Sequence, residues 1–251
     1  MYQSLDAEKI VETVRRLRSR IQERFPAAGL GKVAEHLLEV AQNSASRAAA
    51  IAKPFLPFRI GIGILVIIFL VLVGWIIFNL KISTQIDRFS EFLQALDAAL
   101  NSVLLIGGAI YSLFALEMRL KRNRALKLLY ELRSLAHIVD MHQLNKDPET
   151  ITGAGPVTAS SPKRAMTRFE LSRYLDYCSE MSSLIGKIAA LYVQNYDDPV
   201  VLGAVDQIED LTASLSRKAW QKIMINNQLQ AESPAATRPR PSYSDRSGQI
   251  V

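Results

Sequence analysis

The chain has 251 residues, of which 49% are hydrophobic and 22% charged, and its formal net charge is +6. This length fits one or two domains, and the hydrophobic fraction is too high for a chain that is disordered throughout. A single cysteine excludes an internal disulfide scaffold, and there is no collagen-like glycine period. The apolar residues are concentrated in particular segments, which we take in chain order.

Residues 1–53 have the pattern of two amphipathic helices. Between residues 5 and 25, apolar side chains recur every three or four positions, arginines cover much of the remaining surface, and Pro26 ends the pattern. A second stripe runs through 30–52, weakened in its second half by the small polar Ser44. Two interpretations stay open: basic helices that lie on anionic lipid, or a helical hairpin that packs on a cytoplasmic bundle.

The most apolar segment is 60–80, which has 21 residues and no charge. As a helix it is about 31 Å long, close to the thickness of the hydrocarbon core of a bilayer. Asn79 is next to its end, and Trp75 and Phe78 lie where aromatic rings favour the membrane interface. The segment predicts transmembrane helix 1, because core helices of soluble proteins rarely stay apolar on every face over this length.

A second uncharged segment, 98–116, predicts transmembrane helix 2 as the partner of the first. Its Asn101 lies either near the lipid headgroups, which we favour, or in a hydrogen bond across the helix pair. Gly108 and Ser112, four residues apart, permit a close approach between membrane helices. The short extracytoplasmic connection, 81–97, carries an apolar stripe, and we expect it to lie along the outer interface or to extend the second helix.

The distribution of charge orients the two spans. Residues 1–59 carry a net charge of +4 and residues 117–251 carry +3, whereas residues 81–97 carry −1. Because lysine and arginine resist translocation, we expect both termini in the cytoplasm and the connection outside. The charged, amphipathic N-terminal segment is unlike a signal peptide, and Cys178 is expected to be a free thiol on the reducing side.

Residues 117–229 are expected to form a cytoplasmic helical bundle. No proline occurs between Pro57 and Pro148, so transmembrane helix 2 can continue unbroken to about residue 145. A loop is expected over 150–162, and a third long helix over about 163–197.

The fourth long helix is expected over about 199–229, with Asp198 as its cap and Pro199 in its first turn. Residues 231–251, rich in proline, serine and arginine, predict a disordered tail.

In the three long helices expected between residues 117 and 229, apolar residues recur at alternating spacings of three and four positions. This spacing is typical of coiled-coil-like helices in an antiparallel bundle. The residues expected to face inward are Ala125, Leu128, Leu132, Leu135, Val139 and His142; Leu171, Tyr174, Cys178, Met181, Ile185, Ile188 and Tyr192; and Val201, Val205, Ile208, Leu211, Leu215, Ala219 and Ile223. The predicted fold is all-α: a two-span transmembrane helical hairpin with a cytoplasmic antiparallel bundle.

Little in the sequence predicts chemistry. It has no phosphate-binding loop, dinucleotide fingerprint, nucleophile elbow or paired Cys-x-x-Cys, so we predict no enzymatic activity and no catalytic, cofactor-binding or metal site. His137 and Asp140 share a helix face that could hold a metal ion, but His142 is poorly spaced as a third ligand, and we favour a surface or partner-contact role for His137. We expect His142 to cap the apolar seam and Cys178 to be a buried small hydrophobe rather than a reactive thiol.

The segments RIQERFPAAGLGKVAEHLLEVA and LRSLAHIVDMHQLNKDPE resemble parts of bacterial membrane proteins that have no assigned activity. The resemblance implies a bacterial inner membrane and carries over no functional residue. We expect a non-enzymatic, membrane-anchored scaffold or regulatory interaction module, whose partners are the lipid bilayer and a protein or a second copy of the chain, without a nucleic acid or an evident small-molecule substrate. The alternatives are a signal-transducing element that couples transmembrane helix 2 to the bundle, and a subunit of an oligomeric transporter, which the absence of ionisable residues in both spans disfavours.

Overall fold

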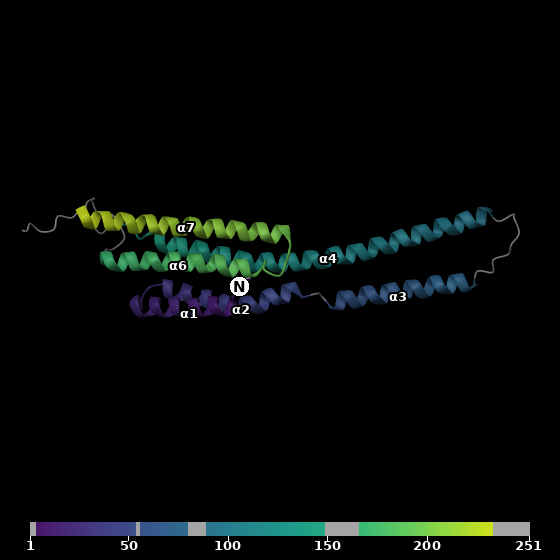
Figure 1. Cartoon of the computed structure of the whole chain (residues 1–251), viewed down its shortest axis with the longest axis horizontal. Coiled ribbons are helices and arrows are strands. Elements are labelled where there is room, and N and C mark those ends of the chain that lie inside the picture. Colours follow the sequence, from purple (N-terminus) through teal and green to yellow (C-terminus); the bar gives the residue numbers. More distant parts are fainter. Residues whose placement is uncertain (1–3, 54–55, 80–88, 149–165, 233–251) are drawn as a thin grey trace, which may run out of the picture.

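A computed structural model describes residues 4–53, 56–79, 89–148 and 166–232, and the regular elements in these ranges are all α-helices. The helices, labelled as in Figure 1, are α1 (Ala7–Arg24), α2 (Leu30–Ala52), α3 (Leu56–Asn79), α4 (Phe89–Leu144), α6 (Arg168–Leu191) and α7 (Pro199–Glu232). The molecule is elongated: a helical bundle forms one end, and α3 projects from it beside the N-terminal part of α4 (Figure 1).

The bundle core lies between the C-terminal part of α4, α6 and α7. The prediction of inward-facing residues is confirmed: nearly all are buried, while Leu128, His142 and Leu211 are partly buried. Leu129 and Ala136 are buried as well, so the apolar face of α4 is wider than one seam. The extra width is needed because α4 packs against α2 in addition to α6 and α7.

The hairpin of α1 and α2 packs on this bundle, α1 against α6 and α2 against both α4 and α6. The apolar stripe of α1 is buried, as are Leu30, Leu37 and Ala41 of α2. Phe25, where α1 ends, meets the rings of Tyr174 and Tyr177 edge-on at 5.4 and 6.1 Å between centroids. The packing interpretation is therefore confirmed. The apolar face of α1 is covered by protein and does not face lipid, and contact of the basic face with anionic lipid stays a prediction.

Capping side chains set where the helices begin. Asp6 caps α1 by accepting hydrogen bonds from the backbone N–H groups of Glu8 and Lys9. Thr167 and Glu170 form a reciprocal capping box at the start of α6, a later start than the predicted 163. The end of α6 at Leu191 also precedes the predicted 197, because residues 192–198 turn the chain back into α7.

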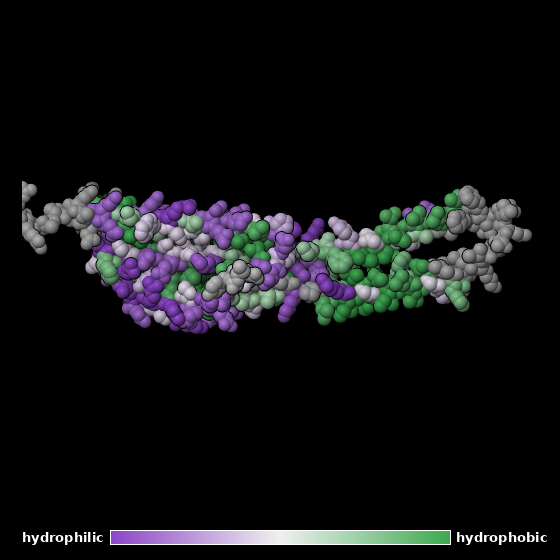
Figure 2. Space-filling model, in the orientation of Figure 1, coloured by the Kyte–Doolittle hydropathy of each residue, from purple (hydrophilic) through white to green (hydrophobic). Residues whose placement is uncertain are grey.

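The two projecting helices carry apolar side chains on their surface (Figure 2). By length and composition, α3 and the N-terminal part of α4 are each able to cross a membrane. Within this projection Leu105 is 76% exposed and Leu70 is 61% exposed. Such exposure is the opposite of what core helices of a soluble protein show.

The helix bounds refine the sequence expectations. α3 begins at Leu56, before the predicted 60, and thus includes Arg59. α4 begins at Phe89, so the C-terminal part of the 81–97 connection extends the second apolar helix; residues 81–88, the loop 150–162 and nearly all of the 231–251 tail lie outside the described residues. As expected, α4 continues without a break to Leu144; at 56 residues it is about 84 Å long.

Two contacts considered between the apolar helices are not made in the described residues. The side-chain amide of Asn101 donates to Asp97 Oδ2 at 3.3 Å, one turn earlier on the same helix, rather than across the pair. Around Gly108, no atom of another helix among the described residues lies within 4 Å of the position a Cβ would occupy, and Ser112 is exposed. The described part of α3 therefore does not make the close approach that Gly108 and Ser112 permit.

Candidate functional site

Charged side chains gather where the projecting helices meet the bundle. One of these charged residues is Glu117, which directly follows the apolar segment 98–116 of α4 and is only 5% exposed. Its Oε1 lies 2.9 Å from Nζ of Lys121, one turn later and also largely covered. A buried carboxylate needs such a partner, because an unpaired buried charge costs several kcal/mol.

A second ion pair joins α4 to the start of α7. Arg122 Nε donates to both carboxylate oxygens of Asp198, at 2.9 Å to Oδ2 and 3.2 Å to Oδ1. Asp198 is 1% exposed and also accepts hydrogen bonds from the backbone N–H groups of Val200 and Val201, which makes it the predicted cap of α7. The hydroxyl of Tyr196 donates to its Oδ2 at 3.4 Å.

These contacts control the charge state of Asp198. Burial by itself raises the pKa of the carboxyl, but the hydrogen bonds from Arg122 and from the backbone of Val201 and Val200 outweigh burial and hold the pKa below its ordinary value. The carboxylate therefore stays ionised, as the pairing with Arg122 requires.

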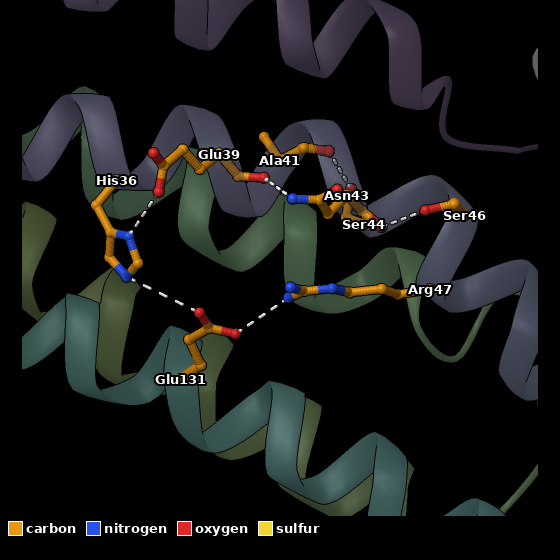
Figure 3. A network of polar contacts seen from close by, with 8 residues as sticks. All are labelled: His36, Glu39, Ala41, Asn43, Ser44, Ser46, Arg47 and Glu131. Carbon is orange, nitrogen blue, oxygen red and sulfur yellow. Dashed lines mark hydrogen bonds and ion pairs between the residues drawn. The ribbon is translucent and has the colours of Figure 1, made fainter.

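Glu131 joins α2 to α4 in the polar network of Figure 3. Its Oε2 accepts from Arg47 Nη1 at 3.2 Å, and its Oε1 lies 3.8 Å from His36 Nε2. His36 Nδ1 also faces Glu39 Oε2 at 3.3 Å. One carboxylate of α4 thus holds two nitrogen-bearing side chains of α2, three turns apart along that helix.

Tyr192 lies next to Arg47 and Glu131 of this network. It is 1% exposed, and its hydroxyl, next to Arg47 and Glu131, has no hydrogen-bond partner by distance and angle among the described residues. Burial raises the pKa of the Tyr192 hydroxyl, so it stays protonated and can act as a donor.

A cavity of about 570 Å³ opens between the C-terminal end of α2 and α4, beside the Arg47–Glu131 pair. Its basic lining side chains come from both helices and are Arg47, Lys53, Lys121, Arg124 and Lys127. Ala50, Ile51 and Leu128 form its apolar wall, and Glu131 is its acidic residue. We call this cavity the basic groove. Its composition suits an anion with an apolar part.

His137 and Asp140 are not brought together with further ligands. His137 is exposed, and Asp140 Oδ1 accepts from Lys218 Nζ at 3.2 Å and from Gln143 Nε2 at 3.0 Å. In the described ranges no group of three or more histidine, cysteine or acidic residues lies close enough to hold a metal ion. Asp140 instead ties α4 to α7.

His142 and Cys178 lie in the core region expected of them. His142 Nδ1 is 3.1 Å from the hydroxyl of Tyr174, and burial, with Lys146 nearby, lowers the pKa of the imidazole. Cys178 is buried and free, and burial raises the pKa of its thiol to about 12. The prediction that Cys178 acts as a buried hydrophobe is confirmed.

Sequence reasoning did not find the basic groove or the ion pairs that join helices distant in sequence. Asp198 was identified only as a helix cap, and Glu131 was not singled out. The sequence does show that Glu117 and Glu131 are the acidic residues at the two ends of the basic run in α4, but it does not show which helix their partners come from.

Comparisons of this chain with protein-family models, with curated proteins and with solved structures found no match.

Proposed function

We propose that this chain is an integral membrane protein, in which 60–80 and 98–116 cross a bacterial inner membrane as a hairpin and hold the helical bundle on the cytoplasmic side. The observation that carries the proposal is the contrast between two parts of one molecule. The bundle buries the apolar side chains of its helix seams, whereas the apolar side chains of the projecting helices remain exposed on most faces, as in Leu70 and Leu105. Hydrocarbon is the environment that such a surface requires.

The charges at the junction support the same placement. Basic side chains cluster within four turns of residue 116 on α4, and Lys53 and Arg59 flank the start of the other apolar segment. This is the arrangement found on the cytoplasmic side of membrane helices. Both termini are then cytoplasmic, and the 81–97 connection is outside.

A single substitution tests the membrane placement. Leu70→Lys puts a charge in the middle of 60–80 and is expected to reduce membrane insertion, since a lysine at the helix centre costs about 3 kcal/mol. Leu202→Lys is the matched control, because Leu202 is an exposed leucine of the bundle. The measurement is the fraction of chain that stays in the membrane pellet after carbonate extraction. Equal fractions for both variants would contradict the proposal, and tag labelling of either terminus from outside the cell would contradict the orientation.

We propose further that the protein acts without catalysis, as a scaffold or regulatory module that binds a protein partner or a second copy of itself. The support is the construction of the bundle: ion pairs and buried seams hold its helices in one arrangement at the membrane surface. Crosslinking of the tagged full chain in intact cells is expected to recover a stoichiometric complex. Repeated recovery of a lone monomer would contradict the scaffold role.

A second candidate function is signal transduction along α4. The observation that favours it is that one unbroken helix, Phe89–Leu144, carries both the apolar segment and the bundle seam, with Arg122 tying it to α7. Three residues inserted after Glu117 rotate the following part of a rigid helix by about 300°. Such an insertion is expected to change the crosslinked complex, and an unchanged complex would contradict a rigid connection.

A further inference from the structure

The charge balance of the basic groove favours an anionic ligand. Three of its five cations already have partners: Arg47 pairs with Glu131, Lys121 pairs with Glu117, and Arg124 is also engaged within the structure. Lys53 and Lys127 take part in no ion pair with the residues that the structure describes. These two ammonium groups approach the same cavity from different helices, so one bound anion could contact both.

The end of the groove that lies nearest the apolar segments, at Lys121, is level with the headgroup layer of a bilayer placed around 98–116, and the rest of the groove extends away from that layer. Lys121 and Lys127 follow residue 116 by five and eleven positions, which is about 8 and 16 Å along the helix. The headgroup region adds about 5–8 Å on each side of the hydrocarbon core, and a lysine side chain reaches several ångströms back toward it. This step rests on the proposed membrane placement of 98–116.

The wall of the groove is apolar as well as basic. Ala50, Ile51 and Leu128 line it together with the cations, and its volume of about 570 Å³ lies within the usual size range of small-molecule sites. A free inorganic anion would leave this apolar wall without a partner. A phosphate ester would contact both parts, with its phosphate at the lysines and its organic part on the apolar wall.

We propose that the basic groove binds the phosphate of an anionic phospholipid headgroup at the junction of α2 and α4. The same phosphate chemistry occurs in soluble phosphate esters, and the position of the groove next to the apolar segments favours the lipid as its source. Bound there, the lipid bridges α2 to α4 beside the Arg47–Glu131 pair, so the composition of the membrane would act on the packing of the hairpin against the bundle.

The experiment uses the purified full chain in detergent, titrated with phosphatidylglycerol or phosphatidylcholine and followed by native mass spectrometry. We expect one phosphatidylglycerol to be retained at least tenfold more tightly than phosphatidylcholine. The double variant Lys53→Gln/Lys127→Gln is expected to weaken this binding about 30-fold, since each lysine near an anionic lipid contributes about fivefold.

The matched control is Arg59→Gln/Arg119→Gln. It removes two exposed charges that lie close to the apolar segments but do not line the groove. We expect this variant to bind phosphatidylglycerol within about threefold of the wild type. An equal loss in both double variants would mean a diffuse charge effect and would overturn the groove as a site.

A separate arm distinguishes the two sources of phosphate. Inorganic phosphate and glycerol 3-phosphate are added to the lipid-free protein, and we expect neither to bind at millimolar concentration. Lysine-dependent binding of either one as tightly as phosphatidylglycerol would overturn the lipid assignment. The fraction of chain in the carbonate pellet is measured for the wild type and every variant. Loss of the wild type from the pellet would contradict the membrane placement. A wild type that stays in the pellet but shows no preference for phosphatidylglycerol would contradict only the proposal that the groove binds lipid.

Discussion

The guanidinium of Arg122 lies against the carboxylate of Asp198, with its Nε 2.9 Å from Oδ2. The two residues come from α4 and from the turn before α7, 76 positions apart. Because the same carboxylate caps α7, the beginning of that helix is tied to α4 only six residues beyond the apolar segment 98–116. This pair sets where α7 starts relative to the proposed membrane surface.

The Asp198→Ala substitution is expected to destabilise the bundle by about 3 kcal/mol. It removes a helix cap, which contributes about 1 kcal/mol, and the charge-assisted hydrogen bonds to Arg122, which contribute about 2. The measurement is urea unfolding of the full chain in detergent, followed by circular dichroism. Asp197→Ala is the control, because Asp197 is exposed and is expected to change the free energy of unfolding by less than about 0.5 kcal/mol. Equal effects of the two variants would contradict the role given to Asp198.

The lowered pKa of Asp198 makes part of the stability dependent on pH. A carboxyl whose pKa is lower in the folded than in the unfolded chain stabilises the fold above its ordinary pKa of about 4, and this contribution is lost as the pH falls through the folded-state value. We expect the free energy of unfolding to fall with acidification below about pH 4, and to fall less steeply in Asp198→Asn. Parallel pH profiles for the two proteins would assign the acid sensitivity to other carboxyls.

The Cys178 thiol is expected to resist alkylation in the folded protein. Burial both shields it and raises its pKa to about 12, so at pH 8 almost none of it is the reactive thiolate. Iodoacetamide labelling should become rapid only in urea. In Cys178→Ala, a cysteine placed at exposed Ser183 of the same helix should react without urea. Labelling of native Cys178 as fast as that control would show that the core around α6 opens readily.

Valine substitutions at two glycines are expected to have different effects on the bundle. At Gly186 of α6, a Cβ would lie 3.1 Å from Thr212 Oγ1 of α7, so Gly186→Val should force the two helices apart and cost about 1–3 kcal/mol. Around Gly203 no atom lies within 4 Å of that position, and Gly203→Val should change stability by less than about 0.5 kcal/mol. Thermal unfolding in detergent compares the two, and similar melting temperatures would contradict the close approach of α6 and α7.

Local patterns in the sequence predicted the helices well. The second predicted helix, 30–52, matches α2 at both ends, and the absence of proline correctly indicated one continuous helix through 98–116 to about residue 145. The inward-facing residues followed from the spacing of apolar side chains, because a helix presents every third or fourth residue on one face. Bounds without such signals, including the ends of α6, were less accurate.

The sequence by itself determined the apolar length of 60–80 and 98–116, the charge asymmetry around them and the periodicity of the bundle helices. These are local properties of consecutive residues. Only the tertiary structure decided that the α1–α2 hairpin packs on the bundle, that Arg122 meets Asp198, and that basic side chains of α2 and α4 line one groove. The composition of an amphipathic face suits lipid and protein equally well, so the sequence does not show which of them covers the face. An ion pair between distant residues leaves no local periodicity in the sequence. The packing of the hairpin and the ion pairs therefore depend on which helices the fold brings together.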